Sequence, residues 1–254
     1  MTFAILGVTI SVLALLERAE RFRFRSSPFF RAFFTTDLIY LVTGYVAGSS
    51  VAIAYIVAAT RLLGAAGIPR LAAAGTPLWL AAPLALVLLD LGNYLAHWLL
   101  HRVDFLWEFH KVHHSSSTLD WLATFRSHVV EQALRRLIAP VLLIAGGFST
   151  DAVVLAGSVF YAWAAFNHAN LRPRLRLLEP VLVTPRLHRL HHLPRTTERN
   201  LGTVFTVWDR LRGSLVVAES PGPMHFGIPG EMETYPQGWL RQLVEPPRRW
   251  LDGA

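Results

Sequence analysis

Histidine is the residue type whose number and spacing in this chain indicate chemistry. The chain has 11 histidines, and most of them fall in short clusters. His97 and His101 are four residues apart, so on a helix their side chains share one face. Residues 110–114 and 188–192 each have the pattern His-x-x-His-His, and one further histidine follows Asn167. Nine histidines are therefore predicted metal ligands: His97, His101, His110, His113, His114, His168, His188, His191 and His192.

The nine histidines are too many for one metal ion. Neutral imidazole binds Fe, Zn, Cu and Ni, and one such ion accepts about four to six ligands. Because the chain contains no cysteine, zinc–thiolate sites, iron–sulfur clusters and thiol nucleophiles are excluded. The histidine pattern therefore predicts a dinuclear site.

Polar residues precede the first histidine pair on the same predicted helix. Asp90, Asn93 and Tyr94 stand seven, four and three residues before His97, on or near its face. A carboxylate within an apolar span is costly and usually has a functional partner. Metal-bound imidazoles commonly donate their second N–H to a carboxylate or a carbonyl. Asp90 and Asn93 are therefore predicted to orient ligand histidines, and the alternative for Asp90 is a polar contact between helices.

A second polar group begins at Arg126. Glu131 in this group is a further candidate to orient a ligand. His128 has three interpretations: a tenth ligand, a hydrogen-bond donor to a ligand, or a residue at a helix interface. His225 has no partner at ligand spacing, so we expect it to be an exposed loop residue.

The composition is that of a membrane protein. Of 254 residues, 53% are hydrophobic and 16% are charged, and the mean hydropathy is +0.38. The net charge of +7 is carried mostly by arginines between apolar runs. Anionic lipid headgroups explain these arginines better than nucleic acid does. We expect an all-α integral membrane bundle that binds no nucleic acid.

Two apolar segments are long enough to cross a bilayer as helices, residues 37–63 and residues 77–100. Residues 3–16 form a shorter apolar segment, interpreted as a retained membrane helix. The loop at 17–31 contains five arginines, which predicts by the positive-inside rule that it is cytoplasmic. Counting crossings from that loop puts every histidine cluster on the cytoplasmic side.

The rest of the chain predicts a hairpin and a cap. Residues 137–147 and 152–166 are apolar and flank a turn with a helix-cap signal, which predicts a helical hairpin. Beyond Asn170 we expect a cytoplasmic cap that contributes to the dinuclear site, with irregular structure after Pro221. We expect a single domain, with N-terminal membrane helices at 1–76, a histidine-box catalytic core at 77–214 and a cytoplasmic tail at 215–254.

The ordered set of clusters resembles the fatty acid hydroxylase and sterol desaturase superfamily of membrane non-haem di-iron enzymes. The resemblance covers about residues 88–214 and includes the histidine clusters, the stretch at 126–131, Asn-His-Ala-Asn at 167–170, Asn-Leu-Gly at 200–202 and the segment at 208–214. The chain differs from the family pattern at Val129, where proline is frequent. It also differs at Ala164, where some hydroxylases have another histidine.

This resemblance implies two iron ions, with zinc as a substitute, and O2 as co-substrate. The implied reaction is hydroxylation or desaturation of a C–H bond in a lipid, fatty-acyl or sterol-like substrate, or cleavage of an ether lipid. An unactivated C–H bond requires reduced metal and O2. Electrons must come from a separate ferredoxin, cytochrome b5-like protein or reductase, because the chain lacks iron–sulfur ligands and a nucleotide-binding fingerprint. The implied location is the bacterial inner membrane, or the endoplasmic reticulum in a eukaryote.

Two other functions remain as alternatives. A zinc-dependent membrane hydrolase would need a general base near its ligands. The HExxH motif is absent, since Trp98 follows His97 and Lys111 follows His110. A membrane metal carrier would place its ligands near the bilayer midplane. The histidines are instead expected at one surface, so the oxidase is favoured.

Overall fold

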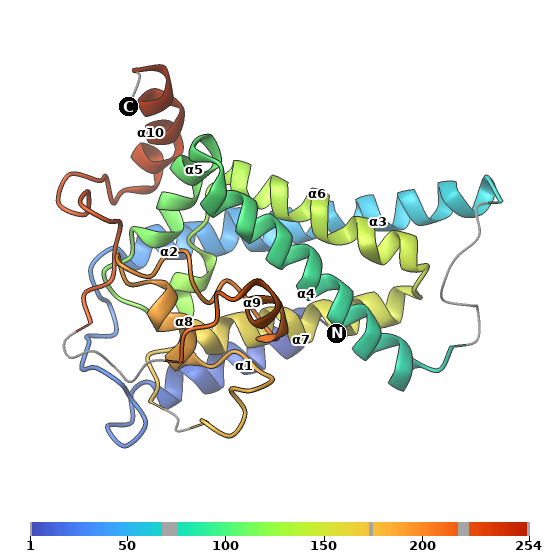
Figure 1. Cartoon of the computed structure of the whole chain (residues 1–254), viewed down its shortest axis with the longest axis horizontal. Coiled ribbons are helices and arrows are strands. Elements are labelled where there is room, and N and C mark those ends of the chain that lie inside the picture. Colours follow the sequence, from blue (N-terminus) through green and yellow to red (C-terminus); the bar gives the residue numbers. More distant parts are fainter. Residues whose placement is uncertain (1, 68–75, 173–174, 218–223, 253–254) are drawn as a thin grey trace.

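The computed structural model describes residues 2–67, 76–172, 175–217 and 224–252, and these residues form helices joined by loops. Two isolated β-bridges occur among them, but no strand does. Long helices run side by side along the longest axis of the molecule (Figure 1). The prediction of an all-α fold is confirmed.

Two helical segments have the length and apolar character needed to cross a membrane. The first is continuous from residue 34 to residue 65 and is made of α2 (Phe34–Tyr40), the π-helical η1 (Leu41–Ala47) and α3 (Gly48–Ala65). The second is α4 (Leu78–Arg102). These segments agree closely with the predicted spans at 37–63 and 77–100. The helix α1 (Thr2–Leu16) is apolar but shorter.

The predicted hairpin is formed by α6 (Val129–Gly146) and α7 (Thr150–His168). The Ser149 hydroxyl accepts a hydrogen bond from the backbone N–H of Ala152, which caps α7 as the sequence indicated. The helix α6 begins eight residues before the predicted residue 137, because its first two turns contain charged residues that interrupt the apolar run.

The helix α4 packs against both arms of this hairpin. At the crossing with α6, a Cβ atom on Gly92 would lie 2.5 Å from the Cα of Ala139. Only glycine permits such close approach of the two backbones. Further along α4, small residues such as Ala85 pack on Leu143 and Ala156 in one apolar cluster. This tight packing fixes the direction of the α4 segment that bears His97 and His101.

Shorter helices lie between α4 and α6 and after α7 in the chain: α5 (Asp104–His114), the 3-10 helix η2 (Trp121–Phe125), α8 (Pro185–His191), α9 (Val207–Arg212) and α10 (Trp239–Leu251). Figure 1 shows α5, α8 and α10 toward one end of the bundle. The expectation of irregular structure after Pro221 is wrong at α10. This helix contains Pro246 and Pro247, residues that usually end a helix.

Candidate metal centre

Four helices bring the nine predicted ligands together. His97 and His101 come from α4, the 110–114 cluster ends α5, His168 ends α7, and the 188–192 cluster lies on and just after α8. Within each of two groups, one candidate ligand atom per residue lies within 4.8 Å of every other. The first group is His97, His101, His110, His114 and His191, and the second is His113, His168, His188 and His192.

Each His-x-x-His-His cluster contributes to both groups. Successive residues of an α-helix point about 100° apart, whereas residues four apart share a face. His110 and His114 therefore enter the first group while His113 enters the second. The 188–192 cluster does the reverse, with His191 alone in the first group.

The spacing of the ring nitrogens suits shared coordination. In the first group, Nε2 of His97 lies 3.1 Å from Nε2 of His110 and 3.2 Å from Nε2 of His101. Ligands bound at about 2.1 Å to one ion and at right angles to each other would be about 3 Å apart. The distances from His97 to His101 and His110 therefore match the spacing of nitrogens that bind one ion.

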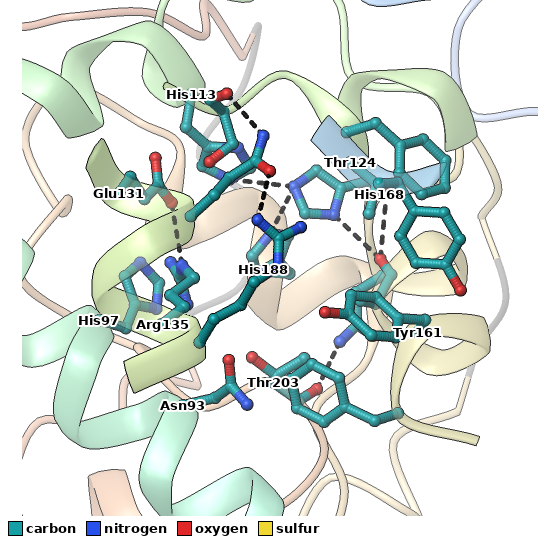
Figure 2. Close-up of a pocket in the computed structure, with 18 residues that line it drawn as sticks. Asn93, His97, His113, Thr124, Glu131, Arg135, Tyr161, His168, His188 and Thr203 are labelled. Atoms are coloured by element: carbon teal, nitrogen blue, oxygen red, sulfur yellow. Dashed lines mark hydrogen bonds and ion pairs between the residues drawn. The ribbon is translucent and has the colours of Figure 1, made fainter. Parts of the chain in front are cut away.

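The second group has the same spacing. Nε2 of His168 lies 3.2 Å from Nε2 of His113 and 3.0 Å from Nε2 of His188. Nε2 of His188 lies 3.1 Å from Nε2 of His192. In Figure 2, dashed lines join the His168 ring to both His113 and His188.

Hydrogen bonds to Nδ1 orient several of these rings. Four rings pair Nδ1 with a backbone carbonyl, at 2.8 to 3.0 Å: His97 with Leu201, His113 with Arg126, His168 with Ala164, and His191 with Arg199. A ring that donates from Nδ1 leaves Nε2 unprotonated and available to a metal.

Several ring nitrogens are buried without a hydrogen-bond partner among the described residues. They include both ring nitrogens of His114 and Nε2 of His191. Buried polar atoms normally have a partner. Burial, together with neighbouring imidazoles, lowers the pKa of His191 to about 3 and that of His114 well below its usual range. These rings are neutral, which is the form that binds metal, so the residues fit two metal ions.

Glu131 lies next to a candidate ligand. Its Oε1 atom is 3.1 Å from Nδ1 of His110 and accepts a hydrogen bond of 2.9 Å from Nε of Arg135. The carboxylate is buried. Glu131 is therefore within contact distance of the His110 ring.

Asp90 contacts the 204–208 segment. Its carboxylate accepts hydrogen bonds from the backbone N–H of Val204 and Phe205, at 2.9 and 3.0 Å, and from the Trp208 indole at 2.8 Å. Leu201, whose carbonyl pairs with Nδ1 of His97, lies three residues before this segment. Among the described residues, the hydrogen bonds of the Asp90 carboxylate go to this segment and none goes to an imidazole.

The remaining polar candidates lie outside the two groups. The amide of Asn93 donates to the Leu89 carbonyl at 3.0 Å, and Asn93 lines the cavity beside the histidines. His128 donates from Nε2 to the Leu243 carbonyl and accepts at Nδ1 from the Val130 backbone N–H, both at 3.1 Å. Because both its ring nitrogens are engaged, the helix-interface interpretation of His128 is favoured. His225 is exposed, as expected.

A buried ionic network holds Arg126, the residue whose backbone carbonyl pairs with Nδ1 of His113. Asp37 accepts a 2.5 Å hydrogen bond from Nε of Arg126 and one of 2.6 Å from Arg31. Arg31 also binds Asp120, which caps η2. Arg31 belongs to the basic loop that is predicted to be cytoplasmic, but its side chain is only 4% exposed. The sequence did not identify Asp37 and Asp120 as the partners of Arg31. A carboxylate at the start of an apolar span, as at Asp37, could have indicated a buried ion pair.

A cavity of about 120 Å³ lies beside the second histidine group (Figure 2). It adjoins a more apolar cavity of about 110 Å³ between α3, α4, α6 and α7. The two cavities share five of their lining residues: Tyr45, Asn93, Arg135, Arg136 and Tyr161. Four of these were missed from the sequence, which gives no direct signal that α3, α6 and α7 meet there.

Comparison with known proteins identifies the family. The fatty acid hydroxylase family profile matches residues 82–214. An ornithine lipid hydroxylase of Rhizobium tropici is 31% identical over 172 residues, which are 67% of this chain and 51% of that protein. An alkylglycerol monooxygenase of Danio rerio is 28% identical over 176 residues, which are 66% of this chain and 37% of that protein.

The matched region spans about half or less of these curated relatives. No solved structure matches the chain. The family match includes all nine histidines of the two groups and Glu131. It also includes the 200–202 and 208–214 segments on which the resemblance was based. The chain therefore belongs to the fatty acid hydroxylase family.

Proposed function

We propose that this chain is a membrane-bound oxidase that binds two iron ions through its nine clustered histidines and uses O2 to hydroxylate a C–H bond of a lipid. The observation that carries the proposal is the position of the two imidazole groups. They are buried beside a cavity that adjoins a second, apolar cavity between the long helices.

In this proposal, five histidines hold one ion and four hold the other. Iron bound there would supply the redox chemistry that activates O2 for attack on an unactivated C–H bond. The protein contributes neutral ligands, and carbonyls and Glu131 set the ring orientation. Zinc would suit the same nitrogen ligands without redox activity.

The two cavities support an amphipathic substrate. The apolar cavity, with walls such as Leu143 and Val154, suits a hydrocarbon chain. The residues shared by both cavities offer hydroxyl, amide and guanidinium groups to a more polar part of the molecule. The names of the relatives specify lipid substrates, an ornithine lipid and alkylglycerols. We favour hydroxylation over desaturation, with ether-lipid cleavage as a variant of the same chemistry.

Two further features belong to the proposal. Electrons would arrive from a separate ferredoxin, cytochrome b5-like protein or reductase, since no redox centre besides the metal site is indicated by the sequence. The bundle would lie in a bacterial inner membrane, or the endoplasmic reticulum in a eukaryote, with the histidines at the cytoplasmic surface. The two long apolar helices and the basic 17–31 loop support this arrangement.

The test begins with protein purified in detergent without added metal. We expect about two iron atoms per chain and O2 consumption that depends on both a chemical reductant and extracted lipid. Mass spectrometry of the lipid should detect an added oxygen, whereas a loss of two hydrogens would indicate desaturation. Zinc without O2 consumption would contradict the oxidase and support the hydrolase. A His191→Ala variant serves as the matched control.

A further inference from the structure

The C-terminal helix α10 has an apolar stripe that faces away from the protein. Leu240, Val244 and Leu251 recur at intervals of four and seven residues, which places them on one helix face. Their exposed fractions are 70%, 59% and 84%. On the opposite face, Gln242 and Pro246 are buried. The stripe therefore has no partner among the described residues.

The buried face of α10 is firmly attached to the histidine-bearing cap. The Gln242 amide donates to the Ser115 hydroxyl and to the Pro236 carbonyl, both at 2.9 Å. The carbonyl of Leu243 accepts from His128. Ser115 directly follows the 110–114 cluster and also accepts from Arg126. The outward direction of the stripe is thus fixed by polar contacts on the other side of the helix.

The apolar surface of α10 is continuous with the cap end of the candidate span α4. Val103, which directly follows α4, and Phe105, the second residue of α5, are 40% and 38% exposed. The Phe105 ring packs on the Trp250 ring with centroids 5.1 Å apart. Exposed side chains therefore continue from the end of the span to α10. In Figure 1, α10 runs across the direction of the long helices and extends beyond the bundle at that end.

The chemistry beside the stripe suits a lipid interface. Trp250 lies on one side of it, and the exposed Arg241 and Arg248 lie on the other. Tryptophan is enriched at the membrane–water boundary, and arginine can bury its methylenes while its charge remains in the headgroup layer. The cap end of the other candidate span also has exposed aromatic residues, Phe29 and Phe30. Both candidate spans thus have exposed apolar and aromatic side chains next to them at the cap end.

We propose that α10 lies in the plane of the bilayer surface, with Leu240, Val244 and Leu251 inserted below the headgroups. In this position it would hold the histidine-bearing cap at a fixed depth. The inference rests on the membrane location proposed above. It goes beyond that proposal because it assigns a lipid-binding role to a helix outside the matched family region.

The absence of cysteine permits a direct test with single-cysteine variants of the full chain in nanodiscs. A nitroxide would be attached at Leu240→Cys or Val244→Cys, at the exposed loop residue Glu233→Cys as a water control, and at the exposed α4 residue Leu84→Cys as a lipid control. Collisions with O2 report lipid contact, and collisions with a water-soluble nickel chelate report contact with water.

We expect the α10 labels to resemble Leu84→Cys, with a loss of accessibility to the chelate and high accessibility to O2. Replacing Leu240 and Val244 together by aspartate should restore chelate access at a Leu251→Cys label. Chelate access at α10 equal to that of Glu233→Cys would overturn the inference while leaving the span intact. Shielding from both reagents would overturn it in favour of a protein contact. Chelate access at Leu84→Cys would contradict the membrane span itself.

Discussion

Glu131 and His110 face each other inside the protein, with 3.1 Å between the carboxylate Oε1 and Nδ1 of the ring. The same oxygen accepts a hydrogen bond from Arg135, which lines the cavity beside the histidines. Glu131 therefore links a proposed ligand to the proposed substrate site. A carboxylate in this position raises the basicity of the ligand and fixes its orientation.

Glu131→Gln is expected to lower iron content or turnover by roughly 10- to 100-fold while the chain remains folded. The amide keeps the size of the side chain but removes the charge that favours N–H donation from His110. Iron content, turnover and thermal unfolding would be measured on the same preparation. Glu233→Gln, which makes the same change on an exposed loop, serves as the control. Normal iron content and turnover in Glu131→Gln would reduce its role to a partner of Arg135.

Asp37→Asn is expected to destabilise the protein. Asp37 is fully buried and pairs with both Arg31 and Arg126, so the substitution removes the carboxylate that pairs with Arg126 and leaves Arg31 paired with Asp120 alone. Breaking a buried ion pair by removing one partner costs about 3–5 kcal/mol. The midpoint of thermal unfolding in detergent should fall clearly. Asp252→Asn removes an exposed pair with Arg248 and should leave the midpoint unchanged, so equal midpoints for the two variants would contradict this account.

Glu17 makes stability depend on pH. Burial and the nearby charge of Asp120 raise the pKa of Glu17 from its ordinary 4.5 to about 7. The folded state therefore holds a proton that the unfolded state has lost between about pH 4.5 and 7, and stability falls as the pH rises through that window. Glu17→Gln retains an acceptor for the backbone N–H groups of Trp121 and Asn170. The variant should unfold at a higher temperature than the original chain at pH 7.5, with a smaller difference at pH 5.

Thermal unfolding across this pH range would check the prediction. A difference between Glu17→Gln and the original chain that does not change with pH would show that the Glu17 proton is not involved. Glu20→Gln, which changes an exposed carboxylate on the same loop, serves as the control and should follow the original chain at every pH.

The topology follows from the basic loop at 17–31. If that loop is cytoplasmic, the continuous helix from residue 34 to residue 65 runs outward and α4 returns to the cytoplasm. Reporter fusions after Leu63 and after Ala254 should therefore lie on opposite sides of the membrane. Reporters on the same side would contradict the proposed cytoplasmic position of the histidines.

The apolar runs were enough to locate the long helices, because a membrane span depends on local composition. The nine histidines that lie in the two groups are the same nine that the sequence predicted as candidate ligands. Their division into two groups was not predicted, since it depends on how α4, α5, α7 and α8 converge. His113 and His114 are adjacent in sequence but belong to different groups.

The supporting contacts were harder to predict than the ligands. Asp90 was expected to contact an imidazole, but its carboxylate binds backbone N–H groups more than 110 residues later in the chain. Arg31 was counted as a loop charge although it is buried against Asp37 and Asp120. Long-range partners of this kind are set by tertiary packing, which local patterns do not encode. Local spacing identified which residues could bind metal but not what holds them in place.

The two histidine groups should fail as a unit when any one ligand is removed. Both groups contain ring nitrogens about 3 Å apart, and two rings in each group donate to backbone carbonyls, so neighbouring rings have little freedom to replace a missing one. Alanine at any of the nine positions should eliminate turnover and lower bound iron, because the two-electron chemistry needs both ions. Membrane insertion should persist, since the apolar helices specify it.

His225→Ala should behave like the original chain, and His128→Ala should retain iron because both its ring nitrogens bind protein groups. Iron content and lipid oxidation would be measured in parallel on purified variants. Near-normal oxidation with full iron content in two or more of the nine variants would refute the shared dinuclear site.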